Sequence, residues 1–251
     1  REERLAFLEA HPAQTDERDD LAIERITLYN QLGRYAEAKE LIAARNFHPW
    51  EGGEGKITGQ YTLCRVELAK IALSKQRYAD ALALLQETES YPHNLGEGKL
   101  ANAEENDIWY YKGEAHRGMG NEAEAKLCFE QATIGSSEPQ QAFFYNDQQP
   151  DKIFYQGLAW RALGMEDKAR SCFNKLIKHG EKHLFDDCRI DYFAVSLPDL
   201  AIWEDDLNKR NRIHCNYVMG LGYLGLEEWQ QAATFLDEVR KLDVNHQGGQ
   251  I

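Results

Sequence analysis

The sequence of 251 residues lacks three features that would place it in particular classes of protein. It has no apolar run near 18 residues, so we expect no transmembrane helix. Its five cysteines are odd in number and include no Cys-x-x-Cys pair, which argues against a disulfide framework and a zinc knuckle. The net charge of −13 disfavours nucleic acid and anionic membranes as partners, because Lys and Arg bind both.

The start of the sequence also lacks a signal peptide. It opens with Arg1-Glu2-Glu3-Arg4, and no apolar segment follows a basic one. There is no initiator methionine, and a predicted helix over 2–10 begins at once, so we expect a fragment of a longer chain. Cys128 and Cys172 each precede a phenylalanine in a helical pattern, which predicts small buried apolar residues. These cysteines favour a reducing compartment, and we expect a cytoplasmic location.

The sequence does contain one pattern repeated five times. A helix-period stretch ends in a small turn, and a second stretch carries an alanine near its start. Because two helices approach closely only where a small residue lies between them, each alanine predicts a helical hairpin. The alanines are Ala38, Ala81, Ala125, Ala169 and Ala232. We expect the hairpins at 19–45, 61–90, 106–134, 151–179 and 209–243.

These five segments resemble the tetratricopeptide repeat family. Glycines of the first helices, Gly113, Gly157 and Gly220, match its small positions, and 242–245 is close to the Leu-Asp-Pro-Asn that often closes such repeats. The resemblance covers most of the chain. It implies an all-α fold, in which helical hairpins form a right-handed superhelix as one array over 1–251.

The spacing of the repeats departs from the family pattern. The alanines lie 43, 44, 44 and 63 residues apart, whereas the family repeats about every 34 residues. Long connections therefore join the hairpins, and we expect an extra helical insert over about 181–208. Long connections on a rigid scaffold often carry function.

The first two connections share a Gly-Glu-Gly-Lys element, at 53–56 and 96–99. One interpretation is structural, with the glutamates capping helices and Trp50 packed in a seam. The other is a ligand-binding loop face, since aromatic platforms beside carboxylates suit sugars or cationic groups. The candidate residues of this loop face are His48, Trp50, Glu51, Glu54 and Glu97.

A second candidate surface follows from the family resemblance, in which the first helices line a concave groove. Repeated aromatic and arginine residues there suit an extended peptide or a carboxylate-bearing ligand. The alternative is core filling with surface salt bridges. The groove candidates are Asn30, Lys70, Tyr110, Glu114, Arg117, Phe154, Arg161 and Tyr217. The Lys/Asn set that grips chaperone C-termini in some relatives is missing, because Ile23 and Thr27 stand at its first positions.

Segments 47–55, 190–199 and 204–211 resemble the C-terminal array of a group of large bacterial proteins. In that group the repeats follow an uncharacterised β-sandwich region similar to sugar-mutarotase domains. The resemblance implies a carbohydrate-related context and a bacterial source. No catalytic residue can be transferred from it.

The sequence offers little sign of catalysis. His179 and His183 have the spacing of a helical metal pair, but Gly180 lies between them near a predicted helix end, and we expect no metal and no cofactor. No nucleophile or metalloprotease motif is present. We therefore predict a non-catalytic scaffold that binds a protein or peptide. The partner is either the missing N-terminal domain of its own chain or another protein. The alternative is a carbohydrate-binding accessory module.

Overall fold

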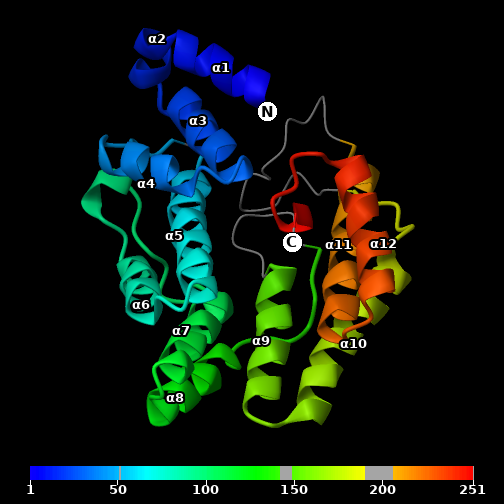
Figure 1. The fold of residues 1–251 in the computed structure, drawn as a ribbon. Helices are drawn as coiled ribbons and strands as arrows, with labels where there is room; N and C mark the ends of the chain where they lie inside the picture. The colour runs from blue at the N-terminus through cyan, green and yellow to red at the C-terminus, as the bar shows by residue number, and fades with distance from the viewer. Residues whose placement is uncertain (51, 142–148, 190–205, 251) are drawn as a thin grey trace. The chain divides into compact units, whose positions relative to one another are not determined.

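The computed structural model describes residues 1–50, 52–141, 149–189 and 206–250 (Figure 1). These residues form helices and no strand. The α-helices are α1 Glu2–Ala10, α2 Pro12–Glu17, α3 Asp19–Gln31, α4 Tyr35–Ala43, α5 Lys56–Ser74, α6 Tyr78–Gln86, α7 Asn106–Gly118, α8 Glu122–Ala132, α9 Pro150–Ala162, α10 Glu166–His183, α11 Leu207–Gly225 and α12 Trp229–Leu242. Short 3₁₀ turns are η1 Glu87–Glu89, η2 His93–Leu95 and η3 Gly248–Gln250.

Each of the five predicted segments coincides with one helix pair, from α3–α4 to α11–α12, although α5 begins at Lys56, before the predicted start at 61, and α10 continues to His183, past the predicted end at 179. The repeated alanine of every second helix is buried, with at most 2% of its surface exposed. Turn glycines such as Gly33 adopt positive φ, which costs glycine nothing because it has no Cβ. In the two hairpins without a turn glycine, Gln76 and Glu227 take that conformation instead. The predicted all-helical fold of paired helices is confirmed for the described residues.

The helices group into two compact units. Unit 1 comprises 1–103 and 114–122, and unit 2 comprises 104–113 and 123–251. The single array over 1–251 therefore stays a prediction. The helical insert predicted over 181–208 falls mostly on 190–205, outside the described residues, while α10 continues to His183 and α11 starts at Leu207.

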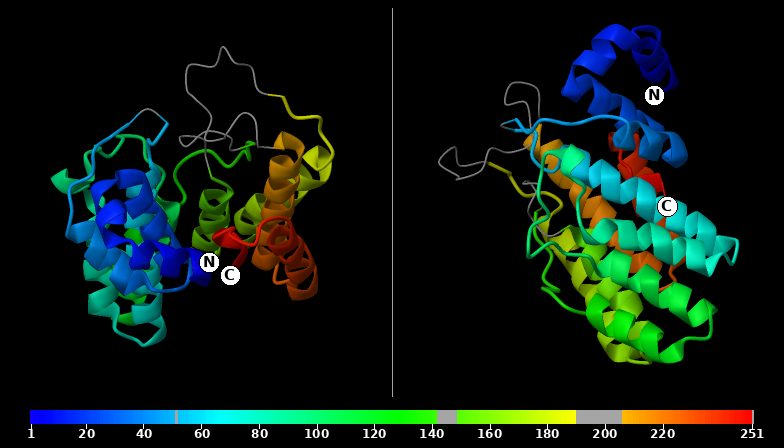
Figure 2. Two further views of the ribbon diagram at one scale, coloured as in Figure 1. Left: turned by 90° about the horizontal axis from the view of Figure 1, so that it is seen from above. Right: turned by 90° about the vertical axis from the view of Figure 1, so that its left-hand side faces the viewer.

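Unit 2 is built around Phe173 of α10, which packs between two glycines. A Cβ atom on Gly157 of α9 would lie 2.3 Å from the Phe173 ring, and one on Gly225 of α11 would lie 2.2 Å from it. These two glycines therefore let α9 and α11 approach α10 from two sides, and α11 also packs on α12 (Figures 1 and 2). Cys172 beside Phe173, like Cys128 on α8, is buried and free, as predicted.

The bulky residues of the second helices are expected from the sequence to fill the seams, and these residues are Tyr35, Tyr78, Phe129, Phe173 and Trp229. Tyr78 does so in unit 1, because its ring occupies the space where a Cβ atom of Gly118 would lie, 2.2 Å away. Trp229 at the corresponding position of α12 does not, since 64% of its surface is exposed. The expectation is therefore wrong for Trp229, because no described residue covers most of its ring.

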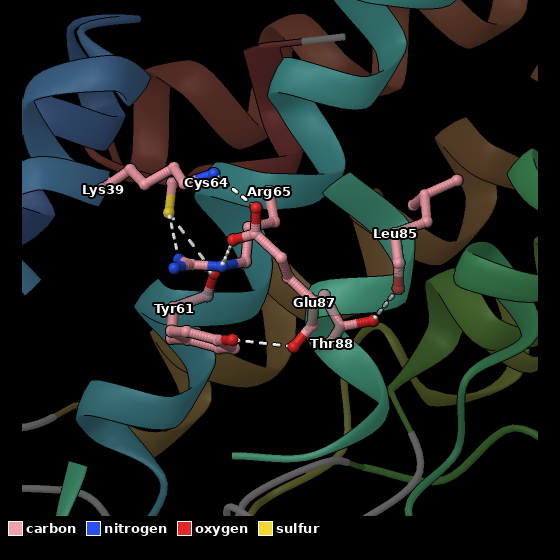
Figure 3. A network of polar contacts seen from close by, with 7 residues as sticks. All are labelled: Lys39, Tyr61, Cys64, Arg65, Leu85, Glu87 and Thr88. Carbon is pink, nitrogen blue, oxygen red and sulfur yellow. Dashed lines mark hydrogen bonds and ion pairs between the residues drawn. The ribbon is translucent and has the colours of Figure 1, made fainter. Parts of the chain in front are cut away.

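A polar network centred on the buried Arg65 joins the first two hairpins of unit 1 (Figure 3). The Arg65 guanidinium lies 3.5 Å from the centroid of the Tyr61 ring on its own helix. Its Nε donates to Glu87 Oε2 at 2.9 Å, and Glu87 Oε1 is 2.6 Å from Lys39 Nζ of α4. The Tyr61 hydroxyl donates to the Glu87 carbonyl at 2.7 Å. One carboxylate thus connects α4, α5 and η1.

We predict that Arg65→Met lowers the free energy of unfolding by about 1.5 kcal/mol, because the hydrogen bonds of the buried guanidinium to Glu87 and to the Tyr61 carbonyl are lost, while Glu87 keeps Lys39 as a partner. Urea denaturation followed by circular dichroism measures the change. The matched control is Arg77→Met, whose side chain is 56% exposed and 3.6 Å from Asp80; it should change stability by less than about 0.5 kcal/mol. Equal effects of the two substitutions would contradict a special role for Arg65.

Candidate functional site

The loop face predicted around Trp50 is partly a packing feature. Trp50 is 37% exposed, and its ring covers Gly53 so closely that a Cβ atom there would lie 2.2 Å from Cε2. One side of the indole therefore supports the loop while part of it reaches solvent. Glu51 lies outside the described residues.

The structure brings the two predicted loops together through Glu97. Its Oε2 accepts from the Gly55 backbone N–H at 2.9 Å, directly before the start of α5. Burial raises the pKa of Glu97, although the Gly55 N–H opposes that rise. Glu54 Oε2 accepts from the Gly52 N–H at 2.8 Å within its own loop. Both carboxylates thus accept from backbone N–H groups of the loops, which favours a structural role for them, although neither caps a helix by a side-chain hydrogen bond.

His48 of the loop face is exposed, with 83% of its side chain accessible. Its backbone N–H donates to Asp19 Oδ2 at 2.7 Å, and its ring Nδ1 lies 3.1 Å from the same oxygen. Although burial alone would raise the pKa of Asp19, the His48 N–H and the Arg45 guanidinium lower it. His48 therefore ties this loop to the start of α3.

The Gly-Glu-Gly-Lys element repeats in sequence but not in structure. Gly55 has positive φ and Lys56 begins α5. In the second copy Gly96 has positive φ, and Lys99 lies in a loop that ends before α7 begins at Asn106. The Lys99 ammonium donates to the Thr88 carbonyl at 2.9 Å. The expectation that each glutamate caps the following helix is wrong, because the second connection is longer and Glu97 turns back to α5.

The groove candidates of unit 1 make local contacts. Asn30 is buried, and its Nδ2 donates to Gln60 Oε1 at 2.8 Å. Lys70 Nζ is 2.8 Å from Glu67 on its own helix. Glu114 and Arg117 pair with each other at 2.6 Å, also within one helix. The side chains of Lys70, Glu114 and Arg117 remain partly exposed. Asn30 instead connects α3 to α5.

The groove candidates of unit 2 largely belong to the core. Phe154 and Tyr217 are each 8% exposed and contribute to the cluster around Phe173. Arg161 donates to the Gly225 carbonyl at 2.8 Å, and its Cζ lies 5.2 Å from the Phe173 ring centroid. Tyr110 packs on Phe129 with ring centroids 5.8 Å apart. The prediction of Phe154 as an accessible groove residue is therefore wrong, because α9 directs this side chain towards α10.

Unit 2 instead gathers polar side chains from two first helices into what we call the tyrosine–carboxylate cluster. Lys152 of α9 is its centre: its Nζ lies 2.5 Å from Asp107 Oδ1 of α7 and 3.6 Å from Asp151 Oδ2. The Tyr111 and Tyr155 hydroxyls share a hydrogen bond of 2.8 Å. The cluster comprises Asp107, Tyr111, Asp151, Lys152 and Tyr155, and its charges also act on Glu104 and Tyr217.

Mutual charge and burial govern the protonation of this cluster. Although burial alone would lower the pKa of Lys152, the carboxylates of Asp107 and Asp151 raise it. Burial raises the pKa of Asp151, and the negative charge of Asp107 adds to the rise while Lys152 opposes it. Burial also raises the pKa of Tyr155 and of Tyr217 well above the ordinary value, with both aspartates contributing. Lys152 is therefore a permanent cation and both tyrosines stay neutral.

Sequence reasoning missed most of this cluster although a signal was present. Asp107 and Tyr111 on one first helix correspond to Asp151 and Tyr155 on the next, each 44 residues on. That distance equals the repeat step. The groove face was placed one residue earlier, at Tyr110 and Phe154, and a shift of one residue turns a helix by about 100°.

A histidine group occupies another part of unit 2. The His179 and His183 rings have centroids 4.6 Å apart, and His183 Nδ1 is 2.6 Å from Asp186 Oδ2. His214 of α11 lies edge-on to His179, and its Nε2 donates to the Gln140 carbonyl at 2.6 Å. Among the described residues, no group of three or more His, Cys, Asp or Glu is arranged to hold a metal ion.

We predict that His214 makes the protein sensitive to mild acid. Burial lowers the pKa of His214 to about 4, so the folded state resists a proton that the unfolded chain takes up near pH 6.5. Stability is unaffected above that pH and falls between about 6.5 and 4, by on the order of 3 kcal/mol in total.

The measurement is urea unfolding at a series of pH values. His214→Gln, which keeps a donor for the Gln140 carbonyl, should flatten the curve in this window. His93→Gln at an exposed position of η2 serves as the control and should leave the curve unchanged. Parallel curves for wild type and His214→Gln would refute the assignment.

Two hairpins match known repeat models. Residues 107–133 and 153–179 each match a model of the tetratricopeptide repeat. A solved structure, "Crystal structure of YrrB: a TPR protein with an unusual peptide-binding site", is similar at 13% sequence identity and a TM-score of 0.34, covering 97% of this chain and 95% of that chain. The peptide-binding site in that description belongs to YrrB. Within the described residues, no helix combines the length and the apolar character needed to cross a bilayer.

Proposed function

We propose that this chain is a non-catalytic interaction module that binds a peptide segment at the tyrosine–carboxylate cluster. The observation that carries the proposal is the Asp–Tyr pair repeated on α7 and α9, with Asp151 still 30% exposed. Repeated side chains at one register present the same groups at regular intervals, which suits an extended chain. The two matches to the tetratricopeptide repeat support an interaction role.

The proposal includes the context implied by sequence resemblance. The module belongs to a larger, cytoplasmic bacterial protein and docks either another domain of that protein or a separate partner. Five free and buried cysteines support a reducing compartment. A scaffold of this kind needs no cofactor, because it only holds its ligand in place.

We predict that removing the paired tyrosine hydroxyls weakens peptide binding without unfolding unit 2. The double variant Tyr111→Phe/Tyr155→Phe keeps both rings and loses the hydroxyl pair. An array of immobilised ten-residue peptides would identify ligands of the wild type, and fluorescence polarisation would measure affinity. We expect the double variant to bind the peptide at least about tenfold more weakly. Each hydroxyl would lose one hydrogen bond of ordinary strength to the peptide.

Tyr223→Phe is the matched control for that experiment. Tyr223 lies in unit 2 as well, but on α11, where its ring stacks on Phe235 with centroids 5.4 Å apart. This variant should bind as the wild type does. If a folded wild-type protein selects no peptide from the array, the proposed function is refuted.

Carbohydrate binding is a second candidate, favoured by the partial exposure of Trp50. An indole with one accessible part, beside the exposed His48, can stack on a sugar ring. Under this alternative, titration with a panel of oligosaccharides quenches tryptophan fluorescence saturably, and Trp50→Ala abolishes the effect. Trp229→Ala is the control, because that indole is more exposed and belongs to unit 2. An absence of saturation across the panel would reject this alternative and leave Trp50 as a packing residue.

A further inference from the structure

The chain after α12 turns back onto unit 2 and lies beside α11 (Figure 1). The reversal follows directly after Leu242, the last residue of α12. Asp243 Oδ1 accepts from the Asn245 backbone N–H at 2.8 Å, and the Asp243 carbonyl accepts from the His246 N–H at 3.2 Å. These two bonds fold the chain back on itself. We call residues 243–250 the return segment.

The return segment covers the ring of Tyr217 on α11. The His246 and Tyr217 rings have centroids 4.7 Å apart. Gly248 lies against the hydroxyl end of the same ring, because a Cβ atom on Gly248 would be 2.3 Å from the Tyr217 oxygen. Only 8% of the surface of Tyr217 is exposed. An imidazole and a glycine of the return segment therefore cover this tyrosine together.

Two glycines let the return segment lie this close to the helices. Gly249 lies against α12, since a Cβ atom there would be 2.9 Å from Val239 Cγ1. The Gly249 backbone N–H donates to His246 Nδ1 at 3.0 Å, which fixes the imidazole. Tyr217 is packed in the core, so a side chain at position 248 would push away the segment and not the ring.

Tyr217 belongs to the same register of the first helices as Phe154. It follows Phe154 by 63 residues, the step that also separates Ala169 from Ala232. Tyr217 and Phe154 share one apolar cluster, and Tyr155 of the tyrosine–carboxylate cluster packs against it. The helices α9 and α11 are in direct contact. The return segment therefore covers the part of this surface that α11 contributes, beside the part proposed to bind a peptide.

Resting on the proposed function, we infer that the return segment is an intramolecular ligand, which a partner peptide must displace from Tyr217. The partner competes for the same contacts, so it presents a ring to Tyr217 and a glycine next to the hydroxyl. The covalent tether gives the return segment an effective concentration of about 1 mM. A segment that binds with a Kd of about 0.1 mM then weakens the binding of a competitor about tenfold.

The test uses a fluorescein-labelled peptide with the sequence of residues 243–250, titrated with the full chain and followed by fluorescence polarisation. Gly248→Val should displace the return segment, because the added side chain collides with Tyr217. This variant should bind the labelled peptide saturably and about tenfold more tightly than the wild type does. The matched control is Gly98→Val, where an added Cβ meets no atom within 4 Å. It should bind as weakly as the wild type.

A second variant reaches the same end without a collision. His246→Ala removes the ring that contacts Tyr217 and adds no bulk, so it should also bind the labelled peptide more tightly than the wild type does. A labelled peptide that carries valine at the position of Gly248 should bind none of the proteins. Circular dichroism verifies that each variant is folded.

The peptides selected from the immobilised array separate this inference from the proposed function. Tighter binding of these peptides by Gly248→Val and His246→Ala supports both ideas. If they bind all the proteins equally and the labelled peptide binds none, the inference is overturned and peptide binding stands. If no folded form selects a peptide from the array, yet both variants bind the labelled peptide, the proposed function fails and the return segment remains an intramolecular ligand.

Discussion

Close contact between a bulky ring and a glycine is the interaction on which the helical packing depends. In unit 2 the Phe173 ring takes the space of two missing side chains, those of Gly157 and Gly225. In the preceding hairpin Phe129 does the same with Gly113. A helix spacing set by ring thickness leaves no room for a methyl group. The same spacing places the first helices α9 and α11 close enough for Asp151 to influence Tyr217. The candidate site is thus a consequence of the way the core is packed.

The sequence alone was sufficient to predict where the helices lie. It was not sufficient to predict which side of each helix faces the core. The repeated alanines and turn glycines mark helix crossings, where sterics permit only small residues, so the five hairpins could be predicted. Phe154 and Tyr155 differ by one residue, and which of them enters the core depends on the crossing angle of α9 and α10. No periodicity in a single sequence supplies that angle. The Asp and Tyr that recur 44 residues apart can be found in the sequence. Their recurrence alone does not tell whether these side chains lie on the surface or in the interior.

The loop residues show a different limit of prediction. Glu54 and Glu97 occupy matching positions of a repeated motif, yet Glu54 bonds within its own loop and Glu97 reaches back to the Gly55 N–H at the start of α5. Chain length between a motif and the next helix decides this, because a longer connection frees the carboxylate to find another backbone donor. Arg65 is similar, since its partner Glu87 lies 22 residues away and meets it only through the turn after α6. Polar networks of this kind depend on tertiary proximity.

The exposed indole of Trp229 shows that a repeat position does not fix burial. Tyr78, three residues before its alanine, lies against Gly118 of the next helix, whereas Trp229 at the same register of α12 has 64% of its surface exposed. One register thus gives a core contact in one hairpin and an apolar ring in water in another. Because burying such a ring against another surface releases the water around it, this position favours association of unit 2 with other apolar surfaces.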